Sequence, residues 1–249
     1  MKKIGIVGGI AWPSTVEYYS EICRLAEEQR VHQPQHGALA MPEMSIESLD
    51  HDKAVAYIGT DGDEESWSRF DTYHRTALQR LEAGGARVAA IASNTSHHRL
   101  AEIVRGIGIP VISIFEAVAR ECARIGTRQV LILGTATTMR SARFREVFDA
   151  HGIEAAGPES VDIRTLTIRL SEELQHGKDE RATARMGEIA RAAFKGRFNL
   201  PAVVCLACTE LPLAFPEFKT LTVFESNGIR YMNSSAVHIR AVFDYAASE

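Results

Sequence analysis

The chain has 249 residues, of which 45% are hydrophobic and 24% charged, a balance typical of soluble globular proteins. Its net charge of −4 gives no basic excess for binding nucleic acid and no charged tail. The length fits one large α/β domain or two halves that each bury a core.

The N-terminal segment MKKIGIVGGI resembles a signal peptide only superficially, because its apolar stretch is short and Trp12-Pro13-Ser14 interrupts it. We expect a first strand there. No run of about 18 apolar residues predicts a membrane-spanning helix.

Short apolar runs alternate with segments of helical spacing along the rest of the chain. The expected strands are Ile4–Val7, Arg87–Ala92, Val111–Ser113, Gln129–Leu133, Ala202–Leu206 and Leu221–Phe224. The expected helices are Thr15–Arg30, Glu64–Ala83, His98–Arg105, Ile114–Ile125, Ser141–His151 and Asp179–Lys195. Glycines stand where helix C-caps fall, at Gly84-Gly85, Gly126 and Gly152.

This alternation predicts an α/β fold with mostly parallel sheets, because the strands lack strict polar alternation. The order of elements repeats in the two halves of the chain. We therefore expect two pseudo-symmetric three-layer domains, with the active site in the cleft between them at the carboxyl ends of the strands. The expected boundaries place 1–100 plus 210–249 in the first domain and 101–209 in the second. Ser45–Trp67 is the least regular region, and reads as a solvated loop or a mobile lid.

Four cysteines, Cys23, Cys122, Cys205 and Cys208, form no disulfide framework in a chain of this size, so free thiols and a cytoplasmic location are expected. The Cys205-x-x-Cys208 pair lacks the two further ligands of a zinc site, and no metal is expected. Cys205 lies within an apolar run and is interpreted as a packed core thiol.

Four polar loops follow expected strands, and they are Gly8–Thr15, Ser93–His97, Gly134–Met139 and Cys208–Glu210. Small residues and hydroxyls let backbone N–H groups face a bound anion, so together the loops favour a carboxylate site. Each hydroxyl also has a structural reading, with Ser14 or Thr15 capping the first helix and Ser141 capping a later one. The first loop matches neither the dinucleotide fingerprint nor a P-loop, which argues against NAD and ATP.

Cys208 is the sharpest catalytic candidate, because it directly follows an apolar strand. Oriented N–H groups of a following helix would lower its pKa and favour the thiolate, which acts as a base or a nucleophile. The alternative is an inert, partly buried thiol.

Over nearly the whole chain, five segments resemble the aspartate/glutamate racemase superfamily. They are GIVGGIAWPSTVEYY near the N-terminus, SNTSH at 93–97, GTATTM, LACTELPL at 206–213 and the terminal NSSAVH. The resemblance implies two pseudo-symmetric α/β domains, no cofactor, a small amino-acid or dicarboxylate substrate, and commonly a homodimer. It also implies a pair of proton-transfer residues on opposite faces of the substrate. Neither a nucleic acid nor a membrane is an implied partner.

Carried onto this chain, the resemblance makes Cys208 the second cysteine of the catalytic pair, and Ser93 stands in the place of the first. Some similar members have Thr at the first position and favour one enantiomer. By analogy Cys208 would take the proton of the L-isomer, while Ser93 or a water that it holds would deliver one to the other face.

The remaining matched positions take supporting roles in this resemblance. Asn94, Thr95, Thr138 and Thr209 would bind the substrate carboxylate or amino group. Trp12 would exclude water, and its alternative role is to pack against Pro13 and the first helix. Glu210 would have a supporting role at the site, and His97 would either assist Ser93 or be a helix-start or core histidine.

The sequence also departs from the family pattern. Met41–Ser45 offers no Arg for an acidic side chain where some aspartate racemases have one, and Asn233 stands where an Asp is common. The superfamily includes decarboxylases and cis–trans isomerases, so a single-cysteine enzyme or a carboxylate-binding protein without turnover are the alternative functions.

Overall fold

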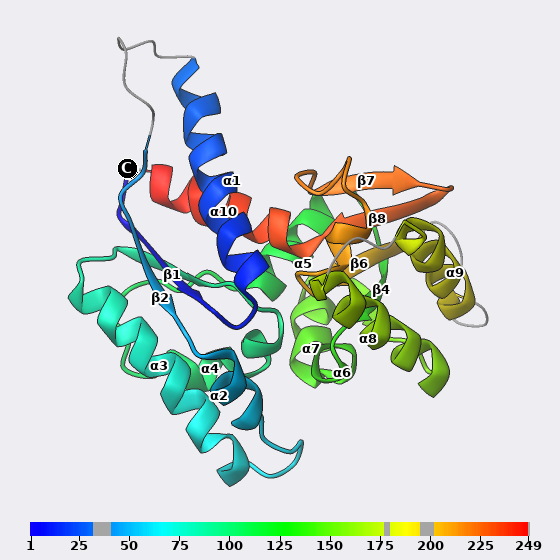
Figure 1. The fold of residues 1–249 in the computed structure, drawn as a ribbon, viewed down its shortest axis with the longest axis horizontal. Coiled ribbons are helices and arrows are strands. Elements are labelled where there is room, and N and C mark those ends of the chain that lie inside the picture. Colours follow the sequence, from blue (N-terminus) through cyan, green and yellow to red (C-terminus); the bar gives the residue numbers. More distant parts are fainter. Residues whose placement is uncertain (32–40, 177–179, 195–201, 249) are drawn as a thin grey trace. The chain divides into compact units, whose positions relative to one another are not determined.

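The computed structural model describes residues 1–31, 41–176, 180–194 and 202–248, which form two compact units (Figure 1). Unit 1 comprises Met1–Ser113 and Ile239–Glu249, and unit 2 comprises Ile114–His238. The fold is mixed α/β with mostly parallel sheets, which confirms the predicted fold class. In the described part of the chain, no helix is both long enough and apolar enough to cross a membrane.

Unit 1 contains a parallel sheet of three strands in the order β2-β1-β3. The strands are β1 (Ile4–Gly8), β2 (Met44–Ser48) and β3 (Val88–Ile91), and the helices are α1 (Trp12–Val31), α2 (His51–Ala56), α3 (Ser68–Ala83), α4 (Leu100–Ile103) and the end of α10 (Ser234–Ala247). Short 3₁₀ helices lie at Glu65–Trp67 and Thr95–Arg99.

The two faces of this sheet have separate cores, because successive strand residues point to opposite sides. Ile4 and Ile6 pack with residues of α1 and α10. Val7, Ala89 and Ile91 pack with residues of α3. Figure 1 shows α1 and α10 on one side of the strands and α3 on the other. Unit 1 is therefore a three-layer structure.

Unit 2 contains a five-stranded sheet in the order β5-β4-β6-β8-β7, parallel except for β7, which runs antiparallel to β8. Its strands are β4 (Gln129–Gly134), β5 (Glu154–Ala156), β6 (Val203–Ala207), β7 (Val223–Ser226) and β8 (Ile229–Asn233). Its helices are α5 (Ile114–Arg124), α6 (Ala136–Arg140), α7 (Ala142–Ala150), α8 (Val161–His176) and α9 (Ala182–Phe194), with a 3₁₀ helix at Leu211–Ala214.

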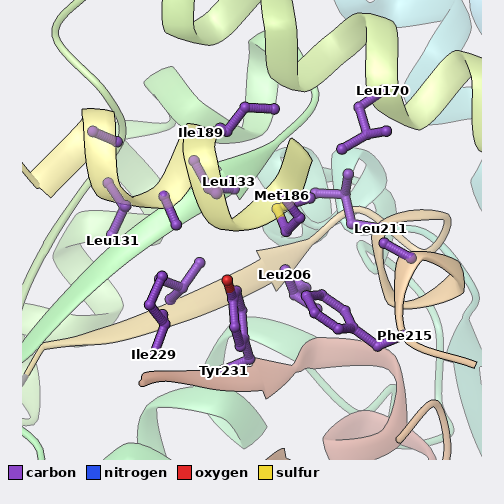
Figure 2. Packing of buried hydrophobic residues seen from close by; sticks show 14 of the residues in the cluster. Leu131, Leu133, Leu170, Met186, Ile189, Leu206, Leu211, Phe215, Ile229 and Tyr231 are labelled. Atoms are coloured by element: carbon purple, nitrogen blue, oxygen red, sulfur yellow. The ribbon is translucent and has the colours of Figure 1, made fainter. Parts of the chain in front are cut away.

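Helices α8 and α9 cover one face of this sheet (Figure 2). Leu133 of β4, Leu206 of β6 and Tyr231 of β8 point toward Leu170 of α8 and Met186 of α9. The opposite face receives α5, whose Cys122 Sγ lies 3.4 Å from Met232 Sδ of β8. Burial on both faces explains why β4 and β6 read as continuous apolar runs.

Several elements differ from the sequence predictions. Val111–Ser113 is not a strand, because Val111 makes only an isolated bridge to Ala89. The sequence did not predict β2, β5, β8, α2, α6 or α8, and β2 and α2 lie in or beside the region expected to be irregular. The first and last residues of the predicted helix Asp179–Lys195 lie outside the described residues. The described part of this range contains α9, at Ala182–Phe194.

The unit boundaries also differ from the expected ones. Residues 101–113 belong to unit 1, where the N–H of Ile112 donates to the carbonyl of Ala89 at 3.0 Å. Residues 210–238 belong to unit 2, because β8 pairs with β6 in parallel, with Leu206 opposite Asn233. Strand pairing thus decides the boundary.

Helix termini were predicted with mixed success. Ser141 caps α7 as expected, its Oγ accepting from the N–H of Phe144 at 3.1 Å. Helix α1 begins at Trp12, so neither Ser14 nor Thr15 caps it. Thr15 Oγ1 instead accepts from the N–H of Gly9 at 2.9 Å and so ties the first loop to the helix.

Candidate active site

In unit 2, polar residues gather at the carboxyl ends of three adjacent strands. Gly134 at the end of β4 is in register with Ala207 at the end of β6, and Leu206 is in register with Asn233 at the end of β8. The loops that follow β4 and β6 therefore leave the same edge of the sheet side by side. A Cβ at Gly134 would lie 2.4 Å from the carbonyl oxygen of Ala207, so only glycine permits this approach.

Cys208 follows β6 directly and is 6% exposed. It belongs to the apolar cluster beneath α8 and α9. Its thiol donates to Oε2 of Glu210, with sulfur and oxygen 2.8 Å apart. The structure thus brings together the two ends of the Cys208–Glu210 loop that the sequence analysis singled out.

This environment raises the pKa of the Cys208 thiol well above its usual value, first through burial and then through the charge of the Glu210 carboxylate. The expectation of a lowered pKa is therefore wrong for this environment. The segment after Cys208 is a four-residue 3₁₀ helix, Leu211–Ala214, which is too short to supply a sizeable helix dipole. Two weaker contacts favour the thiolate, from the backbone of Glu210 and the hydroxyl of Ser171.

The hydroxyls expected to bind substrate in unit 2 have different surroundings. Thr138 is fully buried, and its Oγ1 lies 3.0 Å from Oγ1 of Thr135. Thr135 caps α6 by accepting from the N–H of Thr138 at 3.2 Å. Thr209 is 8% exposed beside Cys208. Thr138 therefore lies within the cap of a helix that starts at the same sheet edge as the thiol.

Asn233 fixes the end of β8 at this edge. Its Oδ1 accepts from the N–H groups of Ser235 and Ala236 at 3.0 and 3.1 Å, so it caps α10. Ser234 Oγ donates to the carbonyl of Leu206 at 2.7 Å. The amide thus performs the capping that an Asp would also perform at this position.

In unit 1, the segment after β3 carries Ser93, Asn94 and Thr95. Ser93 and Asn94 are buried and Thr95 is half-buried at the start of its 3₁₀ helix. His97 donates from Nδ1 to the backbone carbonyl of Ser93 at 2.7 Å, and its Nε2 lies 3.4 Å from the carbonyl of Ile112. Burial lowers the pKa of His97 to about 4. This neutral imidazole thus braces the main chain of the Ser93 loop.

The first loop of unit 1 lies at the same edge, because β1 and β3 are parallel neighbours. The N–H of Ala92 donates to the carbonyl of Val7 at 2.9 Å. Trp12 is 71% exposed, which contradicts the alternative that it packs against Pro13 and the first helix.

Sequence reasoning missed Ser171 because it missed α8. The segment Val161–His176 does carry a helical spacing of buried residues, at Thr167, Leu170 and Leu174. Among the described residues, no group of three or more His, Cys, Asp or Glu side chains is arranged to hold a metal ion.

The chain belongs to the Asp/Glu/Hydantoin racemase family, whose model matches residues 7–242. An aspartate racemase homologue from Pyrococcus horikoshii OT3 is 28% identical, with a TM-score of 0.75 over the whole of both chains.

Two further solved structures share the fold at lower identity. The aspartate racemase of Picrophilus torridus is 18% identical, with a TM-score of 0.71 over 100% of this chain and 96% of its own. The glutamate racemase of Francisella tularensis, solved with D-glutamate, is 14% identical, with a TM-score of 0.64 over 98% of this chain and 80% of its own.

Proposed function

We propose that this protein is an amino-acid racemase or epimerase that works without pyridoxal phosphate or any other cofactor. The observation that carries the proposal is Cys208, a buried thiol at the carboxyl end of β6 that donates to the carboxylate of Glu210. The chain belongs to the family of Asp, Glu and hydantoin racemases. Inversion at Cα needs one group to remove a proton and another to return one.

In the proposed reaction, Cys208 removes the Cα proton of the L-isomer. Ser93, or a water that it holds, returns a proton to the other face of the carbanion. Because a serine hydroxyl is hardly ionised at neutral pH, removal from the D-isomer is slow and the enzyme is biased to L-substrates. This assignment rests on the motif positions, which the family resemblance supplies.

Hydrogen-bond donors near these residues would stabilise the negative charge that develops as the proton leaves. We propose Thr138 and Thr209 from unit 2, and Asn94 and Thr95 from unit 1, as ligands of the substrate carboxylate and amino group. Trp12 would shield the substrate from water, a role for which its exposed side chain is available.

Met41–Ser45 has no Arg to bind an acidic side chain. We therefore propose an amino-acid substrate with a neutral or other side chain that needs no Arg in this segment. A related dicarboxylate is the alternative substrate. We further propose a homodimer in the cytoplasm, in line with the free thiols of all four cysteines.

The decisive experiment is solvent exchange in deuterium oxide over a panel of L- and D-amino acids. Proton NMR follows loss of the Cα signal, and chiral chromatography follows configuration. Exchange with inversion is expected for at least one amino acid. Cys208→Ala should abolish the exchange, whereas Cys23→Ala, at a half-buried cysteine of unit 1, should not. Exchange retained in Cys208→Ala would remove Cys208 from the mechanism.

A second candidate function is a single-cysteine decarboxylase or cis–trans isomerase, which the serine at position 93 favours because such enzymes need no second thiol. No exchange with any amino acid, together with turnover of a malonate or maleate derivative, would establish it. A protein that binds such acids without turnover, with the same affinity in Cys208→Ala, would be a non-catalytic relative.

A further inference from the structure

His74 is a fully buried histidine of α3 whose ring is fixed by its own helix. Its Nδ1 donates to the backbone carbonyl of Phe70, one helical turn earlier, at 2.9 Å. The ring of Phe70 packs against the imidazole, with the two ring centres 4.2 Å apart. Because Nδ1 carries the proton of a neutral ring in this bond, Nε2 is left as an acceptor. Helix α3 therefore sets both the position and the tautomer of the ring.

The acceptor on His74 is used by Ser96, which lies in the segment that follows β3. Ser96 is fully buried, and its Oγ donates to Nε2 of His74 at 3.0 Å. It stands three residues after Ser93, within the 3₁₀ helix Thr95–Arg99. A buried hydroxyl that lost this partner would be left unsatisfied, so the bond favours one position of the segment. The hydrogen bond is a direct side-chain link from α3 to the segment that carries Ser93.

The same segment is held from a second direction by His97. Its Nδ1 donates to the backbone carbonyl of Ser93 at 2.7 Å, and its Nε2 lies 3.4 Å from the carbonyl of Ile112. The two histidines therefore hold different groups. His97 braces the main chain from within the segment, whereas His74 fixes the side chain of Ser96 from a neighbouring helix.

We infer that His74 is a positioning residue for proton return, and that it acts through Ser96 to hold Ser93, or the water of Ser93, within reach of Cα. His74 does not touch the substrate. A misplacement of about 1 Å at a reacting group costs on the order of 10²-fold in rate, so a link of this kind matters for turnover. The inference rests on the proposed function where it concerns proton return, while the link itself is a property of unit 1 alone.

Reaction in deuterium oxide separates proton removal from proton return. Cys208 removes the Cα proton of the L-isomer, its thiol exchanges with solvent, and it then returns a deuteron to the same face, which labels Cα without inversion. Inversion needs Ser93 or its water on the other face. A displaced Ser93 should therefore lower inversion more than it lowers exchange, whereas a general loss of stability should lower both equally.

The test compares His74→Asn with His74→Gln. Asn keeps a donor toward Phe70 and has no acceptor in the place of Nε2, whereas Gln places Oε1 where it accepts from Ser96. The ratio of exchange to inversion should rise on the order of ten-fold in His74→Asn and in Ser96→Ala, and should stay within about two-fold of the parent in His74→Gln. Leu81→Val is the matched control, because Leu81 is a buried residue of α3 that packs beside Gly5, at the other end of the sheet. It should leave the ratio unchanged.

Amide hydrogen exchange over Ser93–His97, followed by mass spectrometry, tests the link without a substrate. It should be on the order of ten-fold faster in His74→Asn and Ser96→Ala than in the parent and the control. Parent amide rates or a parent ratio in both disrupting variants would overturn the inference. So would an equal rise of the ratio in Leu81→Val, or a His74→Gln enzyme that behaves like His74→Asn.

If His74→Asn does not fold, Ser96→Ala decides both measurements, because it removes the same hydrogen bond from the other side. A parent that shows no Cα exchange, or exchange without inversion, would contradict the proposed racemase and not the link. The amide rates of the segment then decide whether His74 holds it.

Discussion

Acidification should destabilise unit 1 through two buried histidines. His74 and His97 lie wholly inside the unit, and burial lowers the pKa of each to about 4 from an ordinary 6.5. Each ring donates from Nδ1 to a main-chain carbonyl, that of Phe70 for His74 and that of Ser93 for His97. His74 Nε2 accepts from the hydroxyl of Ser96 at 3.0 Å, so this ring is held in its neutral form.

The sign follows from where each state binds protons. Between pH 6.5 and 4 the unfolded chain binds a proton on each histidine that the folded chain does not. Stability is therefore full above about pH 6.5, falls as the pH drops through this window, and levels off near pH 4. At pH 5 the difference amounts to about 2 kcal/mol for each histidine. Two such losses are a large part of a typical domain stability.

The assay is urea unfolding from about pH 7.5 to pH 5, followed by tryptophan fluorescence. Both tryptophans belong to unit 1, and Trp67 is buried while Trp12 is exposed, so the signal reports on the unit that holds the histidines. His74→Asn and His97→Asn should each flatten the pH dependence by about 2 kcal/mol, whatever they cost at neutral pH. His176→Asn, at an exposed histidine of unit 2, is the control. Equal pH dependence in the parent and both variants would refute the reasoning.

Three further outcomes are expected. Ser93→Cys should raise Cα exchange of D-amino acids on the order of ten-fold or more, because a thiol supplies the missing base; a folded variant without gain in the NMR exchange assay would break the assigned pairing. Gly9→Ala should destabilise unit 1 by at least about 3 kcal/mol in urea unfolding, because φ is +78° and the new Cβ would lie 2.1 Å from a backbone oxygen. The control Gly62→Ala, where φ is +87° and the space is open, should cost about 1 kcal/mol, and equal costs for the two variants would contradict the predicted clash. Asp71→Asn should lower the free energy of unfolding by about 2 kcal/mol in the same assay, because Asp71 forms a bidentate ion pair with Arg99, at 2.8 and 3.2 Å, in which both side chains are about nine-tenths buried. A decrease of less than about half a kcal/mol would refute this prediction.

The sequence predicts most of the buried strands well because each appears as a short apolar run without polar alternation. β1, β3, β4 and β6 lie within a residue or two of their predicted ranges. The edge strand β2, with the sequence MSIES, is short and half polar, so it carries no such signal. β8 is an interior strand that begins just after a turn at Asn227-Gly228. The apolar run before this turn, Leu221–Phe224, was predicted as the strand of this region, and it corresponds to β7.

The candidate site was predictable as a set of positions but not as an environment. Its loops follow strands whose ends a parallel sheet brings to one edge, so the position of Cys208 beside the Gly134 loop follows from pattern. The protonation of the thiol does not, because it depends on the Glu210 side chain turning back to the sulfur and on α8 bringing Ser171 to it. The periodicity of apolar residues does not predict the direction of a single side chain, and α8 itself was not predicted.

The path of the chain through the two units has a consequence for its synthesis on the ribosome. Unit 2 is one continuous segment, whereas unit 1 needs Ile239, Val242 and Phe243 from α10 to cover one face of its sheet. The N–H of Lys2 also donates to the carbonyl of Ala246 at 2.8 Å, so the two ends of unit 1 meet. A nascent chain can therefore complete unit 2 first, and until α10 emerges it carries a sheet face that α1 covers only in part, which makes the remaining apolar surface one that a chaperone would hold.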